Sequence, residues 1–572
     1  MIRRRRPLQR HEDPAIARAL LDRGLHPVLC RLLASRGARD AAELDMALAG
    51  LAAPDALADG WRAAELLAGA IDAGERICVV ADYDCDGATA CAVAVRGLRR
   101  FGARIDYLVP NRFTHGYGLS PAVVALARSH PRLGEPQWLV TVDNGIASVE
   151  GVEAAHRAGM KVIVTDHHLP GPVLPAAEAI VNPNRVDCGF PSKHLAGVGV
   201  VFYLLGLLRA QRRARGDASV DLVDLLDLVA VGTIADVVRL DANNRRLVAA
   251  GMRRIRAGLA SPGVAALLAV AGVDPARATV RDIGYGVAPR INAAGRLAEI
   301  STGIECLLTE DPGQAARLAG ELDAINRERR RIEQDMRAQA LAEIGAPDAA
   351  RAPVLVVCRD DWHEGVVGLV AGRLKDRHWR PVIALAPARG EPGMLRGSGR
   401  SIPGLHLRDA LETVANRHPG MVARYGGHAM AAGLSLPAAN LPAFAAALRE
   451  AVLELADDHA FDETLLHDGP LAPSDLDLAL LDAIESGIWG QGFPPPTFVN
   501  EFHVERQRIV GEAHLKLSLR LGDRAFDGIA FGRTDPLHAR ALLAYRPERN
   551  AWQGRESIQL VIEDVLEPHP PI

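Results

Sequence analysis

Three aspartates at alternate positions after an apolar run constrain this chain more than any other feature. Asp82, Asp84 and Asp86 follow the apolar residues 77–81, and Gly87 comes directly after them. Alternate residues share one face of a β-strand, so we expect the three carboxylates to point the same way where a strand ends. Converging carboxylates repel each other, and divalent metal ions compensate that charge most directly. Gly87 is expected to let the chain turn tightly into a helix.

Three more polar clusters follow apolar runs that look like strands. They are Asp143-Asn144-Gly145 after residues 138–142, Asp166-His167-His168 after residues 161–165, and Asp236 after residues 225–234. A lone aspartate after a strand is usually a helix cap or a turn residue, but four such clusters are not explained in that way. In a doubly wound sheet, ligands bind outside the carboxyl ends of the strands, so the four clusters are expected to meet at one edge. Oxygen ligands with one or two imidazoles suit Mn²⁺ or Mg²⁺.

These clusters resemble the four motifs of the DHH phosphoesterase superfamily, and within it those of the RecJ family of single-strand-specific exonucleases. Four later segments strengthen the resemblance, which then covers nearly the whole chain. They are residues 290–296 (RINAAGR), 362–368 (WHEGVVG), 397–401 (GSGRS) and 426–433 (GGHAMAAG).

The resemblance implies a site for two ions, Mn²⁺ or Mg²⁺. Asp84 is expected to bind the first ion and Asp86 the second, while Asp143 bridges the two. His167 and Asp236 are expected to complete the second site. The implied chemistry is hydrolysis of a phosphodiester by a water activated between the two ions.

Two residues near the metals are expected to take part in catalysis. His168 is expected to orient the attacking water or to contact the scissile phosphate, and Asp82 either binds metal or holds a ligand in place. One departure stands out, because many members of the superfamily have a histidine where this chain has Val80. We therefore expect the first metal to bind more loosely than the second.

Ten further residues are expected to contact the substrate. For Arg290 and Arg296 a core salt bridge is a fair alternative, and His363 is either a nucleic-acid contact or the cap of a helix. A guanidinium, hydroxyl groups and a Gly-Gly-His turn are groups that bind phosphate. The residues are Arg290, Asn292, Arg296, His363, Ser398, Arg400, Ser401, Gly426, Gly427 and His428.

Length and composition indicate several domains in a reducing compartment. The chain has 572 residues, a hydrophobic content of 49% and a formal net charge of −4, so no global basic field indicates nucleic acid. Its seven cysteines are scattered without a C-x-x-C pair, which argues against disulfides and structural zinc. No apolar run is long enough to span a membrane. We therefore expect a cytoplasmic protein.

The expected fold class is α/β, with two α/β lobes joined by a long helix and followed by a C-terminal β-barrel. The barrel is an OB-fold by the resemblance, and Lys516, Arg520, Arg524 and Arg533 are expected to supply its positive charge. Strict alternation over residues 514–521, with Gly522-Asp523 as the turn, indicates its antiparallel strands. The joining helix starts near Asp311-Pro312, and its arginine-rich face is either solvated or lines a DNA channel. The domains are expected at residues 1–55 (N-terminal helical accessory segment), 56–250 (catalytic DHH domain with a mainly parallel sheet), 251–345 (helical connector), 346–455 (DHH-associated phosphate-binding domain) and 456–572 (OB-fold).

The leading functional hypothesis is a metal-dependent 5′-to-3′ exonuclease. By the resemblance it degrades single-stranded DNA to 5′-mononucleotides in recombination and repair, beside a helicase and single-strand binding protein. The first alternative is a small-substrate phosphoesterase, acting on pyrophosphate, short oligoribonucleotides or cyclic dinucleotides. The second is a non-catalytic DNA-binding scaffold. The protein is expected to be a monomer, and the cleavage polarity does not follow from these residues.

Overall fold

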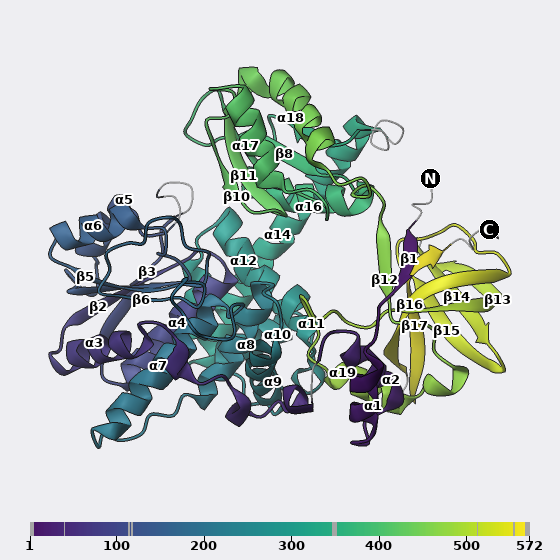
Figure 1. Ribbon diagram of the computed structural model, residues 1–572, viewed down its shortest axis with the longest axis horizontal. Helices are drawn as coiled ribbons and strands as arrows, with labels where there is room; N and C mark the ends of the chain where they lie inside the picture. Colours follow the sequence, from purple (N-terminus) through teal and green to yellow (C-terminus); the bar gives the residue numbers. More distant parts are fainter. Residues whose placement is uncertain are drawn as a thin grey trace. The chain divides into compact units, whose positions relative to one another are not determined.

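The computed structural model describes residues 5–38, 41–111, 115, 118–345, 352–511, 513–552 and 555–566 (Figure 1). The chain divides into two compact units. The first contains residues 325–465 with the N-terminal residues up to Leu8, and the second contains residues 9–324 and 466–572.

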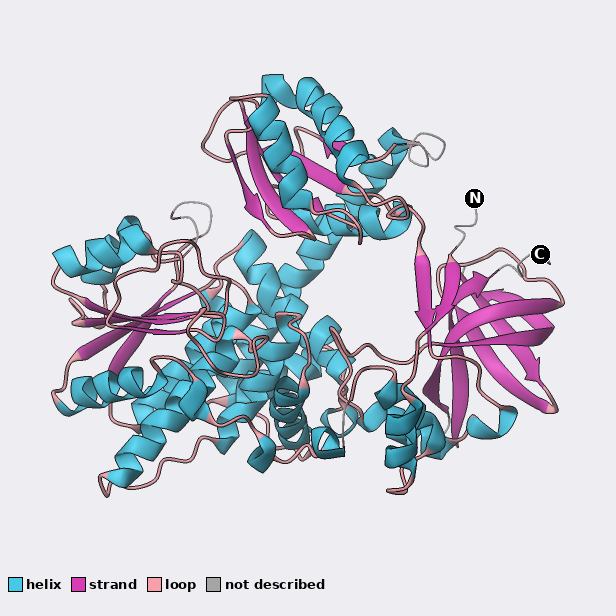
Figure 2. Cartoon of the chain, in the orientation of Figure 1, coloured by secondary structure: helices cyan, strands magenta, loops and turns pink. Residues whose placement is uncertain are grey.

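A five-stranded parallel sheet organises the second unit. Its strand order is β3-β2-β4-β5-β6, and every neighbouring pair is parallel. Helices cover both faces, with α5 and α6 on one side and α3 and α7 on the other (Figures 1 and 2). The elements are α3 (Gly60–Asp72), β2 (Arg76–Ala81), α4 (Cys85–Arg100), β3 (Arg104–Leu108), α5 (Pro121–Arg128), β4 (Trp138–Val142), α6 (Val149–Arg157), β5 (Lys161–Thr165), β6 (Ala179–Val181) and α7 (Gly197–Ala214).

Burial on both faces explains why these strands are continuous apolar runs. In β2, Val79 packs in the cluster that contains α3 and α7, whereas Val80 packs in the cluster that contains α5 and α6. Val80 is fully buried in this way and is not a candidate ligand. The predicted sheet is therefore confirmed, and its carboxyl ends carry the first three polar clusters.

The fourth apolar run is a helix, so the prediction of a strand over residues 225–234 was wrong. Residues Leu226–Ala235 form α8, and Asp236 is its C-cap. The run is apolar with hardly a polar interruption because α8 is buried on nearly all sides. Such a run fits a buried helix as well as a buried strand, and its ten residues favour a helix.

Helices follow α8 as far as residue 308. A single turn of π-helix at Ile283–Val287 precedes α12. The helices are α9 (Ala242–Arg256), α10 (Pro262–Val270), α11 (Val280–Asp282), α12 (Ala288–Leu297) and α13 (Ser301–Leu308).

The long connecting helix α14 spans Pro312–Ile344 and starts where the sequence predicted. Its arginine-rich face is not uniformly solvated. Arg329 and Glu333 are buried, and the Arg329 guanidinium donates to Glu333 at 2.7 Å and to Asn326 at 2.6 Å. These two side chains therefore stabilise the first unit rather than face a channel.

The first unit contains a second five-stranded sheet, with strand order β10-β11-β9-β8-β7. Only the β7–β8 pair is parallel. Helices α17 and α18 pack on one face with the apolar core, and α16 packs against β8 and β9. The elements are β7 (Leu355–Cys358), α16 (Val367–His378), β8 (Val382–Pro387), β9 (Met394–Arg400), α17 (Leu407–Arg417), β10 (Arg424–Gly427), β11 (Ala431–Pro437) and α18 (Leu441–Leu455).

The C-terminal strands close into a barrel in the order β13-β14-β15-β17-β16, as predicted for an OB-fold. Strand β14 has the predicted bounds, and the predicted turn at Gly522-Asp523 joins it to β15. The elements are α19 (Leu478–Ser486), β13 (Phe498–Val510), β14 (His514–Leu521), β15 (Arg524–Ala530), β16 (Arg540–Trp552) and β17 (Arg555–Leu566).

Short elements at the two ends of the chain complete the fold. Strand β1 (Arg6–Gln9) pairs with β12 (Thr464–His467), and helices α1 (Pro14–Leu21) and α2 (Pro27–Ala34) follow β1. Among the described helices, none is both long and apolar enough to cross a membrane.

Candidate metal centre

The first aspartate cluster lies in the turn between β2 and α4. Asp84 is the N-cap of α4, and its carboxylate accepts a hydrogen bond from the Gly87 N–H at 3.0 Å. Asp86 lies in the first turn of α4, and β2 ends before Asp82. The expectation that three carboxylates share a strand face was therefore wrong, because the turn into α4 sets their directions.

Gly87 has a different role from the predicted turn. It lies inside α4, and a Cβ atom there would come within 2.6 Å of the Asp82 carbonyl oxygen. Only glycine lets the helix approach the Asp82 backbone so closely.

Asp143 follows β4 with a φ angle of 62°, which is an uncommon conformation for a residue with a side chain. Asp143 is almost fully buried, and its N–H donates to the Thr165 carbonyl at the end of β5. The next residue, Asn144, donates from its side chain to the carbonyls of Val80 and Val142. Asn144 thus fixes the ends of two neighbouring strands beside the site.

Asp166 orients the two histidines that follow β5. Its carboxylate accepts from the N–H groups of Ile146, His167 and His168. The same carboxylate lies 2.7 Å from Nδ1 of His168. Asp166 is therefore a positioning residue, because its two oxygens are committed to these contacts.

His167 lies between two of the predicted metal ligands. Its Nε2 is 3.1 Å from Oδ1 of Asp143 and 3.5 Å from Oδ2 of Asp236. Asp86 is brought alongside by the start of α7, where the N–H groups of Gly197 and Val198 donate to its carboxylate at 2.7 and 3.0 Å.

Three groups of ligand atoms in this region have the spacing to hold a metal ion. Within each group the atoms lie within 4.8 Å of one another. The seven sequence-predicted metal and catalytic residues are all present in them. The groups are Asp82, Asp84 and Asp143; Asp86, His167 and Asp236; and Asp143, His167 and His168.

Burial disfavours the ionised form of the carboxylates in this cluster unless a cation binds beside them. Burial, with the charge of Asp84, raises the pKa of Asp82 to about 8 and that of Asp236 to about 7. Burial raises the pKa of Asp86 and of Asp143 well above the usual range. A bound divalent cation would favour the ionised form of all four.

The two histidines have opposite protonation preferences. Burial and the neighbouring charge of His168 lower the pKa of His167 to about 4, so His167 is neutral near pH 7, as a metal ligand must be. Burial alone would lower the pKa of His168, but the hydrogen bond and charge of Asp166 raise it to about 9. His168 therefore carries a proton near pH 7.

The donor set fits Mn²⁺ or Mg²⁺. Nε2 of His167 and Oδ2 of Asp236 are buried, and within the described part of the chain neither atom has a partner in hydrogen-bonding geometry, although Nε2 is 3.1 Å from Oδ1 of Asp143. Buried polar atoms without a partner are rare and need an explanation, and an ion supplies it. The other donors are carboxylate oxygens, which these hard ions prefer.

Metal binding is expected to stabilise the protein measurably. At free Mn²⁺ one hundred times the dissociation constant, the ion contributes about 2.7 kcal/mol to the free energy of unfolding. We expect Mn²⁺ to raise the melting temperature of the metal-stripped protein in differential scanning calorimetry. The control is Mn²⁺ with excess EDTA, and an unchanged melting temperature would contradict the site.

Residues 290–296 support the first motif instead of lining an open channel. The buried Arg290 guanidinium pairs with Asp323 at 2.8 Å, which is the core salt bridge left open as an alternative. Asn292 accepts a hydrogen bond from the Cys85 N–H at 2.9 Å, at the start of α4. A Cβ at Gly295 would lie 2.1 Å from the Tyr83 carbonyl oxygen, so glycine is needed there. Arg296 is half-buried on the same helix.

In the first unit, the GSGRS segment places its residues on alternate faces of β9. Ser398 and Arg400 face α16, where a Cβ at Gly368 would come within 3.0 Å of both side chains. Gly397 and Gly399 face the apolar core, where a Cβ would meet Leu385 or Leu407. The two glycines therefore allow close packing of the core, while the side chains of Ser398 and Arg400 lie on the opposite face of β9, towards α16.

The remaining predicted contacts differ in their surroundings. Ser401 is buried, and its hydroxyl donates to the Leu405 carbonyl, so it holds a loop. His363 accepts a hydrogen bond from the Gly365 N–H in the turn before α16, whose N-cap is Val366, so His363 does not cap that helix. Gly426 and Gly427 lie on the edge strand β10, and the His428 N–H donates to the Ala431 carbonyl in the turn to β11.

Sequence reasoning missed the residues that hold the histidine loop. Asn182 donates to the His168 carbonyl at 2.9 Å, and Asn184 donates to the His167 carbonyl at 2.5 Å. The Asn-Pro-Asn triplet after β6 was the available signal, because side-chain amides beside a proline commonly fix loops.

Family models match three consecutive parts of the chain, and together with the site they define a phosphoesterase of the DHH class. The matched families are the DHH family, N-terminal domain (residues 76–233), the DHHA1 domain (351–454) and the RecJ OB domain (467–564).

Relatives that match over nearly the whole chain indicate one family within this class. The single-stranded-DNA-specific exonuclease RecJ of Dickeya dadantii is 47% identical over 578 residues, covering 98% of both chains. The RecJ of Escherichia coli K12 is 47% identical over 559 residues, covering 95% of this chain and 96% of the relative. The crystal structure of Thermus thermophilus RecJ with Mn²⁺ matches with a TM-score of 0.83 at 30% identity, covering 99% of this chain and 80% of that chain. The chain belongs to the RecJ family.

Proposed function

We propose that this protein is a metal-dependent exonuclease that degrades single-stranded DNA from the 5′ end to 5′-mononucleotides in recombination and repair. The observation that carries the proposal is the pair of ligand groups around Asp143, one formed with Asp82 and Asp84 and the other adjoining His167. Two ions held so closely stabilise both the attacking and the leaving oxygen of a phosphodiester.

The side chains have distinct roles in this proposal. Asp84 and Asp143 hold one ion, and Asp86, His167 and Asp236 hold the other, with Asp143 shared. Asp82 either joins the first group or holds it in place. His168 keeps its proton because Asp166 accepts from it, and it faces the scissile phosphate as a cation. Asp166 fixes the direction of that ring.

The face of β9 that carries Ser398 and Arg400 is proposed to bind a backbone phosphate. Burial lowers the pKa of the Arg400 guanidinium, which donates hydrogen bonds to the Ser398 hydroxyl and the Gly399 carbonyl, both uncharged. A buried cation beside a helix N-terminus favours an anionic ligand. The role of Gly426, Gly427 and His428 in the same phosphate site is proposed with it.

Arg400→Met is expected to raise KM for single-stranded DNA by about tenfold, because a hydrogen bond to a charged group contributes about 1.5–3 kcal/mol. Steady-state kinetics on polymeric DNA measures the effect, and Arg400→Lys should lie between the two. Arg417→Met is the matched control, since Arg417 is exposed and pairs with Glu454. Equal KM values for Arg400→Met and wild type would rule out the phosphate contact.

The barrel is proposed to hold the strand on the outward face of β13–β15. Two of the expected cations are paired there, Lys516 with Asp527 and Arg520 with Glu505. An aromatic platform that the sequence did not reveal is Phe531, which is 60% exposed and contacts the His514 ring at 5.2 Å. Exposed rings of this kind stack with bases of single strands.

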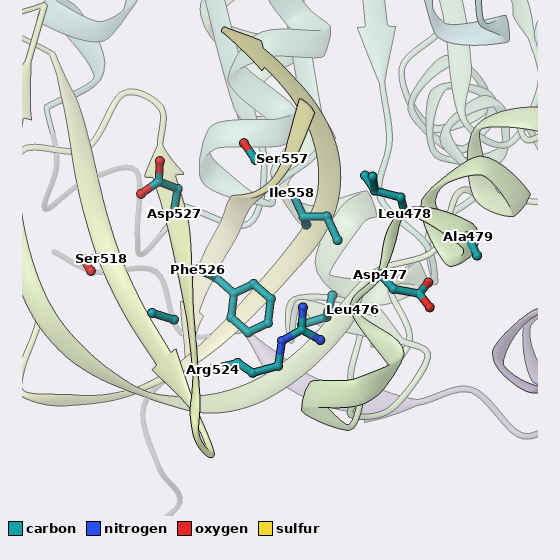
Figure 3. Close-up of a pocket in the computed structure, with 11 residues that line it drawn as sticks. Leu476, Asp477, Leu478, Ala479, Ser518, Arg524, Phe526, Asp527, Ser557 and Ile558 are labelled. Atoms are coloured by element: carbon teal, nitrogen blue, oxygen red, sulfur yellow. The ribbon is translucent and has the colours of Figure 1, made fainter. Parts of the chain in front are cut away.

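A separate hollow of about 720 Å³ lies between the start of α19 and strands β15 and β17. Figure 3 shows Arg524 beside Phe526 there, with the carboxylates of Asp477 and Asp527 on its walls. Phe526, the aromatic ring of this hollow, is buried and offers no platform for a base. We therefore assign the strand to the outward face and not to this hollow.

The deciding experiment uses long single-stranded DNA labelled at either end, with Mn²⁺, Mg²⁺ or EDTA. Early release of labelled mononucleotide from the 5′ end, abolished by EDTA, supports the proposal. Release from the 3′ end first would reverse the polarity. Rapid cleavage of dinucleotides without degradation of long DNA would favour a small-substrate phosphoesterase, and DNA binding without cleavage would favour a scaffold.

The surroundings of the enzyme are proposed on the same basis. All seven cysteines are free, which suits a reducing compartment, and we infer that the protein works as a monomer in the cytoplasm. A helicase and single-strand binding protein are the proposed partners, because they supply and coat the substrate. We propose domain boundaries after residues 55, 250, 345 and 455.

A further inference from the structure

Helix α2 is buried on two opposite faces. Val28 and Leu32 lie in the apolar cluster of the barrel, one helical turn apart. Cys30 and Leu33 lie in the cluster of the catalytic domain. A helix of this short length contributes to both cores at once, and the three matched family domains begin only at residue 76.

Arg36, just after α2, holds the chain segments that lead into the barrel. Its guanidinium makes a two-pronged ion pair with Asp468 at 2.7 and 2.9 Å, and its Nε donates to the Pro494 carbonyl at 2.6 Å. Its side chain is 1% exposed, and Asp468 also accepts from the Thr497 N–H, one residue before β13. A buried, bidentate pair of this kind fixes geometry strictly.

Residues 488–493 make the corresponding contact on the catalytic side. The Leu240 N–H donates to the Gln491 carbonyl at 2.8 Å. A Cβ at Gly490 would lie 2.6 Å from the Leu240 side chain, and one at Gly492 would lie 2.4 Å from Arg239. Leu240 is only four residues after the metal ligand Asp236.

Stacked rings connect these two contacts. The Arg36 guanidinium lies 5.3 Å from the Trp489 ring, which stacks on Phe493 at 5.5 Å. On the other side, the Arg245 guanidinium of α9 lies 4.0 Å from the Phe493 ring. The row therefore runs from the N-terminal segment to the helix that follows Asp236.

We propose that α2, Arg36 and residues 488–493 form a joint that holds the barrel at one position relative to the metal ligands. The N-terminal segment then has a function in the reaction, because a strand bound by the barrel reaches the metals in a constant register. This rests on the proposed binding of the strand by the barrel. Arg36 and Phe493 are positioning residues, since neither is placed at the metal site.

The test compares KM and kcat of Arg36→Met on long single-stranded DNA and on a tetranucleotide. Fixed coupling of two binding sites raises affinity for a ligand that spans both, so we expect KM for long DNA to rise about tenfold with kcat unchanged. A tetranucleotide that occupies the metal site alone gains nothing from the coupling and should show no change. Phe493→Leu, which keeps an apolar side chain but removes the ring stack on Trp489, should act in the same way, and Arg18→Met on the exposed face of α1 should be neutral.

Equal effects of Arg36→Met on both substrates, or none on either, would overturn the joint. Hydrogen exchange provides a readout without DNA: the Leu240 amide should exchange faster in Arg36→Met, although Arg36 is not its partner, and an unchanged rate also counts against the joint. If the wild type itself has equal KM values for both substrates, the strand-binding role of the barrel fails instead. In that case the joint is tested by the hydrogen-exchange result only.

Discussion

Asp143→Ala is expected to reduce turnover of single-stranded DNA below about one per cent of the wild-type rate, because removing a shared ligand unseats both ions of a two-metal site. Asp143 belongs to two of the three ligand groups, and its Oδ1 lies 3.1 Å from His167. Its main chain keeps the hydrogen bond to Thr165, so the turn should survive the substitution. Initial rates at saturating Mn²⁺ measure the effect.

The fold of the variant provides the control. Burial raises the pKa of Asp143, so the carboxylate opposes folding when no cation is bound. Its removal offsets the strain of an alanine at a φ of 62°, so the melting temperature of the metal-stripped protein should change little. The rise in melting temperature with Mn²⁺ should be lost. Residual activity well above the expected level in a folded variant would contradict the bridging role.

Gly197→Ala is expected to lower activity by about a hundredfold, since displacing a catalytic group by about 1 Å has that effect. A Cβ at Gly197 would lie 2.6 Å from Oδ1 of Asp143, while the Gly197 N–H donates to Asp86. A methyl group in this place pushes one ligand and turns the donor away from another. Affinity for Mn²⁺, measured by calorimetric titration, should fall with activity.

Gly206→Ala in the same helix is the matched control. A Cβ at Gly206 meets no atom within 4 Å, so alanine should stabilise α7 by up to about 1 kcal/mol without changing activity. If Gly197→Ala retains wild-type activity and Mn²⁺ affinity, the close approach of α7 to the metal ligands is not needed.

The fold was predictable where burial and periodicity agreed. The apolar runs that became β2, β4 and β5 each ended in a polar cluster, and strict alternation indicated β14. The secondary structure of the run that became α8 was not predictable, because a fully buried helix and a fully buried strand are equally apolar. Asp236 still follows the end of the element, because the apolar run ends at the same place whether it forms a helix or a strand.

The site was predictable in its residues more than in its geometry. The carboxylates converge as expected, yet the cause is the capped turn at Asp84 and not a shared strand face. Arg290 and Asn292 were expected at the substrate, but their partners are Asp323 and the Cys85 N–H. The sequence does not show whether the partner of a charged or amide side chain belongs to the protein or to a ligand. The approach of Gly197 to Asp143 was not foreseeable, because it depends on the packing of α7.

Anomalous diffraction from crystals soaked in Mn²⁺ tests the central claim most directly, which is that these ligands hold two ions around Asp143. The account predicts two peaks, one beside Asp82 and Asp84 and one beside His167 and Asp236, both within coordinating distance of Asp143. A single peak, or peaks that leave Asp143 without an ion, would contradict it.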